Sequence, residues 1–70
     1  MTNLQEMLKE EFYSPYAVAK LESELRGRVV PPQKLYGYVR NGYIQATLNS
    51  TGKLQISKAD AEAYLQKFAK

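Results

Sequence analysis

Residues 43–57, YIQATLNSTGKLQIS, contain the change of apolar spacing that decides the fold. Apolar and polar residues alternate on both sides of a short centre, with Ile44, Ala46 and Leu48 before it and Leu54 and Ile56 after it. The centre, Asn49-Ser50-Thr51-Gly52, consists of residues that favour turns. Because a period of two is typical of half-buried strands, the stretch predicts a β-hairpin with strands of roughly five residues.

The residues after this hairpin predict a final helix over 58–69. Ser57 and Asp60 have the spacing of an N-cap followed by an acid in the first turn. The apolar residues that follow recur at helical spacing and form one stripe: Ala61, Tyr64, Leu65 and Phe68.

The residues before the hairpin predict two helices, over 15–26 and 32–41. Ser14-Pro15 suits an N-cap and a first turn, and Gly27 suits the end of that helix. Ala17, Val18, Leu21 and Leu25 are spaced to face a core. Pro32 can open the second helix and Gly42 can close it. In the second helix one side has Leu35, Tyr38 and Val39, and the other has Gln33, Tyr36, Gly37 and Arg40.

A further short helix is expected over residues 3–12, where Leu4, Met7, Leu8 and Phe12 follow helical spacing. We therefore expect one small domain over residues 1–70, with residues 1–12 as an N-terminal helical extension. The N-terminal stretch is too acidic for a signal peptide, which predicts a cytoplasmic protein.

The chain has no cysteine and no histidine, which removes the usual metal ligands and the usual acid/base and thiol catalysts. The acidic pairs Glu10/Glu11 and Glu22/Glu24 are explained as solvated helix charges. Neither a glycine-rich phosphate loop nor an apolar run of membrane length is present in the sequence. We expect no enzyme activity, no cofactor and no metal site.

The net charge of +3 hides an uneven distribution. Residues 25–59 contain no acid and six basic residues: Arg26, Arg28, Lys34, Arg40, Lys53 and Lys58. Residues 1–24 carry a charge of −3, and residues 60–70 are neutral. A basic block without acids indicates a face that meets a polyanion, although small basic proteins with merely solvated charges are also common.

Residues 38–68 resemble the second half of the excisionase/MerR-like DNA-binding family. The resemblance rests on Tyr38-Val39-Arg40-Asn41-Gly42-Tyr43-Ile44 before the hairpin and on Ile56-Ser57-Lys58-Ala59-Asp60-Ala61-Glu62-Ala63-Tyr64-Leu65 after it. Residues 16–21 resemble the family's first helix, so the likeness covers about residues 13–68. The segment from Glu22 to Val30 is longer than the family's usual turn, either because the first helix extends or because the turn is larger.

The resemblance implies a mainly α fold with a small β-hairpin wing, a winged helix-turn-helix. It implies a sequence-specific DNA-binding protein of phage or plasmid type. Such a protein is either an excisionase, which is a recombination directionality factor, or a small transcriptional regulator. The partners it implies are double-stranded DNA, an integrase and further copies of the chain on DNA, so the bound protein would be associated with the nucleoid. The alternative is a non-catalytic adaptor that uses the same fold to bind a protein, with residues 1–12 as its docking or dimerising helix.

The candidate DNA-binding residues fall into three groups. The recognition helix would offer Gln33, Lys34, Tyr36, Gly37 and Arg40 to the major groove, where glutamine can bond adenine and arginine can bond guanine. Pro32, at its start, would leave the N-terminal end of the helix near phosphate. The hairpin tip would offer Asn49, Ser50, Thr51 and Lys53 to the adjacent backbone or minor groove. Arg26 and Arg28, beside Gly27, would contact backbone phosphates. Any hairpin tip and any solvated helix face can carry these residue types, so each group also has a purely structural explanation.

Overall fold

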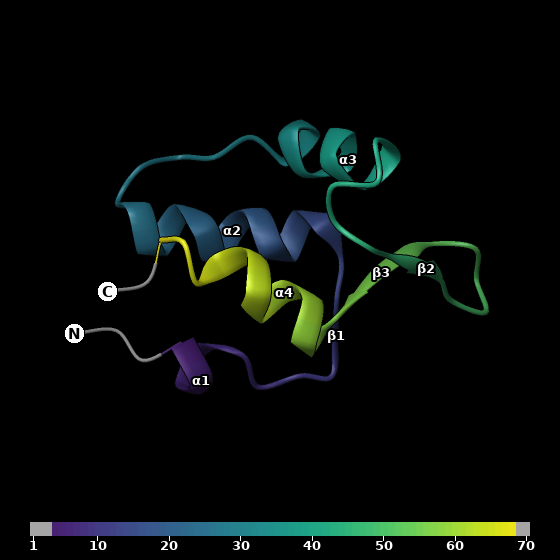
Figure 1. Cartoon of the computed structure of the whole chain (residues 1–70), viewed down its shortest axis with the longest axis horizontal. Helices are drawn as coiled ribbons and strands as arrows, with labels where there is room; N and C mark the ends of the chain where they lie inside the picture. The colour runs from purple at the N-terminus through teal and green to yellow at the C-terminus, as the bar shows by residue number, and fades with distance from the viewer. Residues whose placement is uncertain (1–3, 69–70) are drawn as a thin grey trace.

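Four helices and three short strands make up residues 4–68, the part of the chain that the computed structural model describes. In chain order they are α1 (Leu4–Met7), β1 (Phe12–Tyr13), α2 (Pro15–Arg26), α3 (Pro32–Arg40), β2 (Thr47–Leu48), β3 (Leu54–Ser57) and α4 (Lys58–Leu65). Figure 1 shows α2 across the middle of the molecule, with α3 on one side of it and α1 on the other. The predicted mainly α fold with a small β-hairpin is confirmed.

Both ends of α2 follow from local chemistry. The Ser14 side chain accepts a hydrogen bond from the Ala17 N–H at 3.1 Å, which caps the first turn. Gly27 takes a φ of 71°, a left-handed conformation that costs other residues about 1–2 kcal/mol. The predicted boundaries of this helix are therefore confirmed.

The turn between α2 and α3 is organised by Ser23. Its hydroxyl donates to the Ala19 carbonyl at 2.9 Å and accepts from the Val30 N–H at 2.8 Å. The long segment noted in the sequence is thus divided: the helix continues to Arg26, and residues 27–31 form the turn. α3 then runs to Arg40, one residue short of the predicted end, and Gly42 has a φ of 78°.

The hairpin strands are shorter than predicted. The Tyr38 carbonyl accepts hydrogen bonds from the N–H groups of both Tyr43 and Ile44, so the chain bends at these residues instead of continuing a strand. β2 pairs with β3 only at Thr47–Gln55 and Leu48–Leu54.

The predicted helix over 3–12 is wrong beyond Met7, and residue 3 lies outside the described residues. Phe12 and Tyr13 instead form β1, which pairs with Ser57 and Ile56 of β3. The Lys58 N–H donates to the Glu11 carbonyl at 2.8 Å, which extends this pairing. The sheet order β1-β3-β2 therefore fixes the hairpin to the start of α2.

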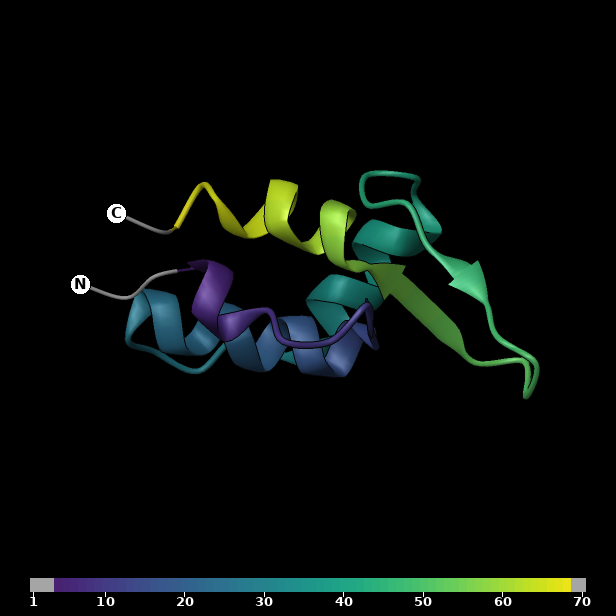
Figure 2. The same ribbon diagram turned by 90° about the horizontal axis from the view of Figure 1, so that it is seen from below.

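The core lies between the helices and the inner face of this sheet. Its buried apolar residues come from all four helices or their flanks and from β3: Leu4, Leu8, Val18, Ala19, Val30, Leu35, Ile44, Ile56, Ala61, Tyr64 and Leu65. Burial of each large aliphatic side chain contributes about 1.5–3 kcal/mol. Figure 2 shows the hairpin extending away from the helices, at the end remote from both termini.

The predicted final helix begins correctly but ends earlier. Ser57 caps α4 by accepting from the Asp60 N–H at 3.2 Å. The helix ends at Leu65, and residues 66–68 continue as a turn that brings Phe68 against the core. The last residue of the prediction, 69, lies outside the described residues.

Candidate nucleic-acid interface

The outer face of α3 is polar and exposed. Leu35 is fully buried beneath the helix, whereas Gln33, Tyr36 and Arg40 are exposed on the other side. This division matches the two faces predicted from the sequence. Nine residues at 1.5 Å each make α3 about 13 Å long, a size that fits a major groove.

Gly37 leaves open space in the middle of this face. A Cβ atom placed on Gly37 would meet no heavy atom within 4 Å, and its φ is not positive. Neither packing nor backbone conformation in this chain therefore requires glycine there. Glycine costs a helix about 1 kcal/mol relative to alanine, and here it leaves the backbone on this side of α3 uncovered by a side chain.

The hairpin tip uses Asn49 to hold its own turn. The Asn49 Oδ1 accepts from the N–H of Thr51, the hydroxyl of Thr51 and the N–H of Lys53, at 2.7–3.0 Å. The Asn49 N–H also donates to the Lys53 carbonyl at 2.9 Å. Asn49 thus shapes the tip, while Ser50, Thr51 and Lys53 are exposed on it.

Arg28 and Val29 are exposed in the turn that precedes α3, and Val29 is 90% exposed. Arg28 borders a hollow of about 410 Å³ at the C-terminal end of α2, which Leu25, Arg26, Lys67 and Phe68 also line. From left to right in Figure 1, this turn, α3 and the hairpin succeed one another along the molecule.

Two of the predicted DNA contacts point inward to a buried carboxylate. Arg26 Nη1 lies 2.8 Å and Lys34 Nζ lies 3.0 Å from Glu22 Oε2. Tyr64 donates its hydroxyl to Glu22 Oε1 at 2.5 Å. Glu22 is completely buried, so the interpretation of this residue as a solvated helix charge is wrong.

Burial alone raises the pKa of Glu22, but the hydrogen bonds from Tyr64, Arg26 and Lys34 outweigh it and hold the pKa below its ordinary value of 4.5. Burial, and then the bond to the Glu22 carboxylate, raises the pKa of Tyr64. The pair is therefore a carboxylate and a neutral phenol.

The predicted core face of α2 is correct for Val18, and Leu21 and Leu25 pack against the core, but Ala19 and Glu22 were not predicted there. Val18, Ala19 and Glu22 are buried, whereas Ala17, Leu21 and Leu25 are only half-buried. The signal that was available is the position of Glu22, four residues after Val18 and three after Ala19. A search for apolar residues at helical spacing does not count a carboxylate, so it did not identify Glu22 as buried.

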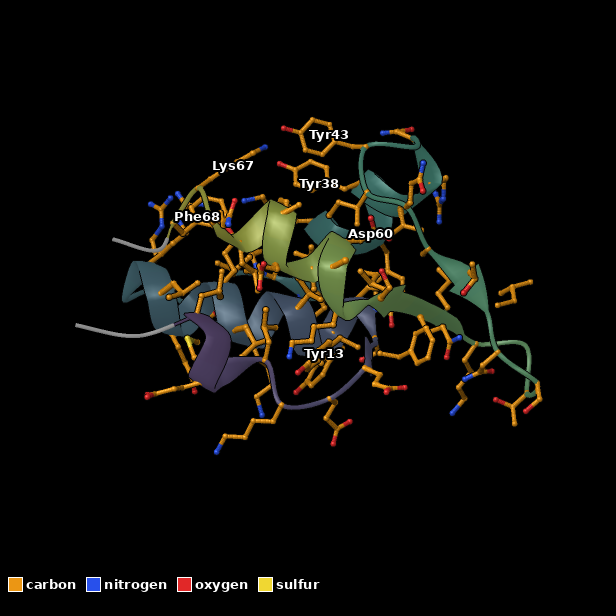
Figure 3. The ribbon with its side chains drawn as sticks, turned by 60° about the horizontal axis from the view of Figure 1, so that its bottom comes forward. Tyr13, Tyr38, Tyr43, Asp60, Lys67 and Phe68 are labelled. Atoms are coloured by element: carbon orange, nitrogen blue, oxygen red, sulfur yellow. The ribbon has the colours of Figure 1, made fainter. Side chains whose placement is uncertain are left out.

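A stack of aromatic rings and one lysine lies beside the end of α3 (Figure 3). The Tyr38 and Tyr43 ring centroids are 4.9 Å apart, and Lys67 Nζ donates to the Tyr43 hydroxyl at 2.7 Å. A hollow of about 410 Å³ adjoins this stack, and a second hollow of about 330 Å³ shares Ile44, Gln45 and Asp60 with its lining.

Residues 4–12, the described part of the expected docking segment 1–12, do not form the free helix of the adaptor hypothesis. Leu4 is 9% exposed and Leu8 is 1% exposed, because both pack into the core of their own chain. Phe12 remains 48% exposed, on the outer face of β1.

Among residues 4–68, no group of three or more acidic, histidine or cysteine side chains is placed to hold a metal ion. Over the same range, every helix is too short or too polar to cross a lipid bilayer. Comparison of the chain with protein-family models, with curated proteins and with solved structures finds no match.

Proposed function

We propose that this chain is a winged helix-turn-helix protein that binds double-stranded DNA without catalysing a reaction. α3 would enter the major groove as the recognition helix. The hairpin tip would contact the neighbouring backbone or minor groove. The observation that carries the proposal is the exposed face of α3, where Gln33, Tyr36 and Arg40 surround the open position at Gly37.

The side chains on this face suit base recognition. Glutamine can form two hydrogen bonds with adenine, and arginine can form two with guanine. Tyr36 is 40% exposed and offers a ring edge and a hydroxyl to the same groove. Leu35 is fully buried below them, so the helix is held firmly while its outer side remains free.

The pairing of β1 with β3 supports the wing assignment. It ties the hairpin to the start of α2, while α2 packs against α3. The tip therefore has a fixed place relative to the recognition helix, which a second contact on the same DNA requires. Lys53 and Arg28 supply cations on either side of α3 for phosphate contacts.

The sequence resemblance supports an excisionase-like role or a role as a small transcriptional regulator. In the first, the protein would act with an integrase and with further copies of itself on DNA. Both roles place it in the cytoplasm, associated with the nucleoid when bound. The non-catalytic adaptor remains the second candidate, because the hollows beside Tyr43 and Phe12 offer exposed apolar surface to a protein.

A mobility-shift assay with short duplex DNA tests the proposal. We expect binding at 50 mM salt that weakens as salt is raised, because phosphate contacts release counterions. The double variant Tyr36→Ala/Arg40→Ala alters two exposed residues of α3 and should remove sequence preference while the circular dichroism spectrum is retained. Absence of DNA binding by the folded wild-type protein at 50 mM salt would overturn the DNA-binding function in favour of the adaptor.

A further inference from the structure

We propose that Glu22 is an internal counterion that withholds Arg26 and Lys34 from DNA, so that α3 meets the groove with Arg40 as its one available cation. Glu22 would thereby limit non-specific binding and raise the share of affinity that depends on sequence. This inference rests on the DNA-binding function proposed above.

Arg26 and Lys34 both point toward the protein interior and pair with Glu22. Arg26 and Lys34 approach the same oxygen of Glu22, at 2.8 and 3.0 Å, from α2 and from the first turn of α3. Their side chains are 25% and 29% exposed, whereas that of Glu22 is not exposed at all. The Arg26 guanidinium also lies 5.0 Å from the centre of the Phe68 ring.

Release of either cation to a phosphate would leave the buried carboxylate short of a partner. An unpaired buried charge is far more costly than a screened contact at the surface is favourable. Tyr64 already donates its hydroxyl to the other oxygen of Glu22, so Tyr64 cannot replace a cation that leaves. Arg26 and Lys34 are thus expected to keep their places when DNA binds.

The counterion changes the electrostatics that the sequence suggests. The acid-free block of residues 25–59 has six cations, which would give a slope of about −5 for log affinity against log salt. Without Arg26 and Lys34, four cations remain, and the slope is at most about −3.6. Among residues 4–68, Arg28, Arg40 and Lys53 have no acidic partner and are exposed.

Two variants that remove the same charge test the inference. Lys34→Gln and Lys53→Gln are compared by measuring affinity for duplex DNA between 50 and 200 mM salt. Raising salt from 50 to 200 mM lowers affinity by a factor, and loss of one phosphate contact makes that factor about 3.5-fold smaller. We expect Lys53→Gln to reduce this factor by about 3.5-fold and Lys34→Gln to reduce it by less than about 1.5-fold. A 3.5-fold change for Lys34→Gln would show that Lys34 contacts phosphate, and would overturn the inference while the DNA-binding function stands.

Neutralising the counterion gives the converse test. Glu22→Gln should free two cations, steepen the salt slope by one to two, and raise affinity for random DNA more than for the preferred site. Glu24→Gln, an exposed position on the same helix, removes the same charge without touching Arg26 or Lys34. Equal slopes for the two folded variants would overturn the inference. If Glu22→Gln does not fold, as judged by circular dichroism, the comparison of Lys34→Gln with Lys53→Gln decides alone.

Discussion

Arg40 and Lys53 are both exposed cations, but the proposed function gives α3 and the hairpin tip different roles on DNA. Arg40→Ala should cost about 1–3 kcal/mol of binding free energy and relax preference at one base pair, because arginine reads guanine in the major groove. Lys53→Ala should weaken binding to every sequence alike and reduce the salt slope by about one. Mobility shifts with specific and random duplexes measure both effects.

Both variants should keep the stability of the parent, since neither side chain contributes to the core. If Arg40→Ala weakens specific and random DNA equally, α3 is not the recognition helix.

Tyr64 tests the buried cluster through stability. Tyr64→Phe removes the donor that the Glu22 Oε1 oxygen uses, and a charged acceptor left without its partner costs about 1–3 kcal/mol. Urea denaturation should show this loss without a change in helix content at low urea. Tyr43→Phe serves as the control, because Tyr43 is 61% exposed and water can replace its bond to Lys67. Equal stability losses in the two variants would argue against the buried bond.

The ionisation of Glu22 makes stability depend on acidity. Because its pKa in the folded chain lies below the ordinary 4.5, the stabilisation is complete above about pH 4.5 and is lost as the pH falls through the folded value. Urea unfolding at a series of pH values from 7 to 2.5 measures this loss. Glu24→Gln should retain the acid sensitivity of the parent, whereas Glu22→Gln should show less. Parallel curves for all three proteins would contradict the assignment.

At the residue scale, exposure could be predicted where it depends on spacing within one helix. It could not be predicted where a buried side chain has hydrogen-bond partners on other elements. The division of α3 into buried Leu35 and exposed Gln33, Tyr36 and Arg40 follows from spacing alone. The ion-pairing of the buried Glu22 does not, because only Arg26 lies on the same helix, whereas Lys34 and Tyr64 come from α3 and α4. No local pattern joins Glu22 to Tyr64.

At the element scale, two glycines of similar appearance in the sequence have opposite roles. Gly37→Ala should stabilise the protein by about 0.5–1 kcal/mol, since the new methyl group meets open space and alanine favours helix. Gly27→Ala should destabilise it by about 1–2 kcal/mol, because the φ of 71° is strained for alanine. Thermal unfolding measures both signs.

The same two variants, Gly37→Ala and Gly27→Ala, test the proposal that the outer side of α3 faces DNA. Gly37→Ala should lower DNA affinity although the protein is more stable, whereas Gly27→Ala, when folded, should bind as the parent does. Unchanged affinity in Gly37→Ala would remove this position from the interface.

Elements with local start and stop signals were predictable, and the element without them was not. Ser14 and Gly27 bound α2, and Ser57 starts α4, as their side-chain chemistry predicts. β1 has only Phe12 and Tyr13, and it is a strand only because β3 pairs with it. The helical spacing of Phe12 with Leu4 and Leu8 therefore led to the wrong prediction.

At the scale of the whole molecule, the proposed function gives one chain one nine-residue helix, α3, for one groove. Such a contact covers few base pairs, so useful discrimination should require two or more copies side by side on DNA. Footprinting over a range of protein concentrations should show protection that extends in steps. A footprint of constant length up to saturation would contradict this expectation.

The pairing of β1 with β3 also determines when the molecule can fold. Tyr13 pairs with Ile56, so the sheet joins two distant segments and closes residues 13–56 in one loop. The entropy lost in closing that loop must be offset by contacts that already exist, and the neighbouring helices α2 and α3 can form theirs first. On a ribosome, the apolar residues of α2 and α3 that pack on β3 and α4 must therefore stay uncovered until those elements have emerged.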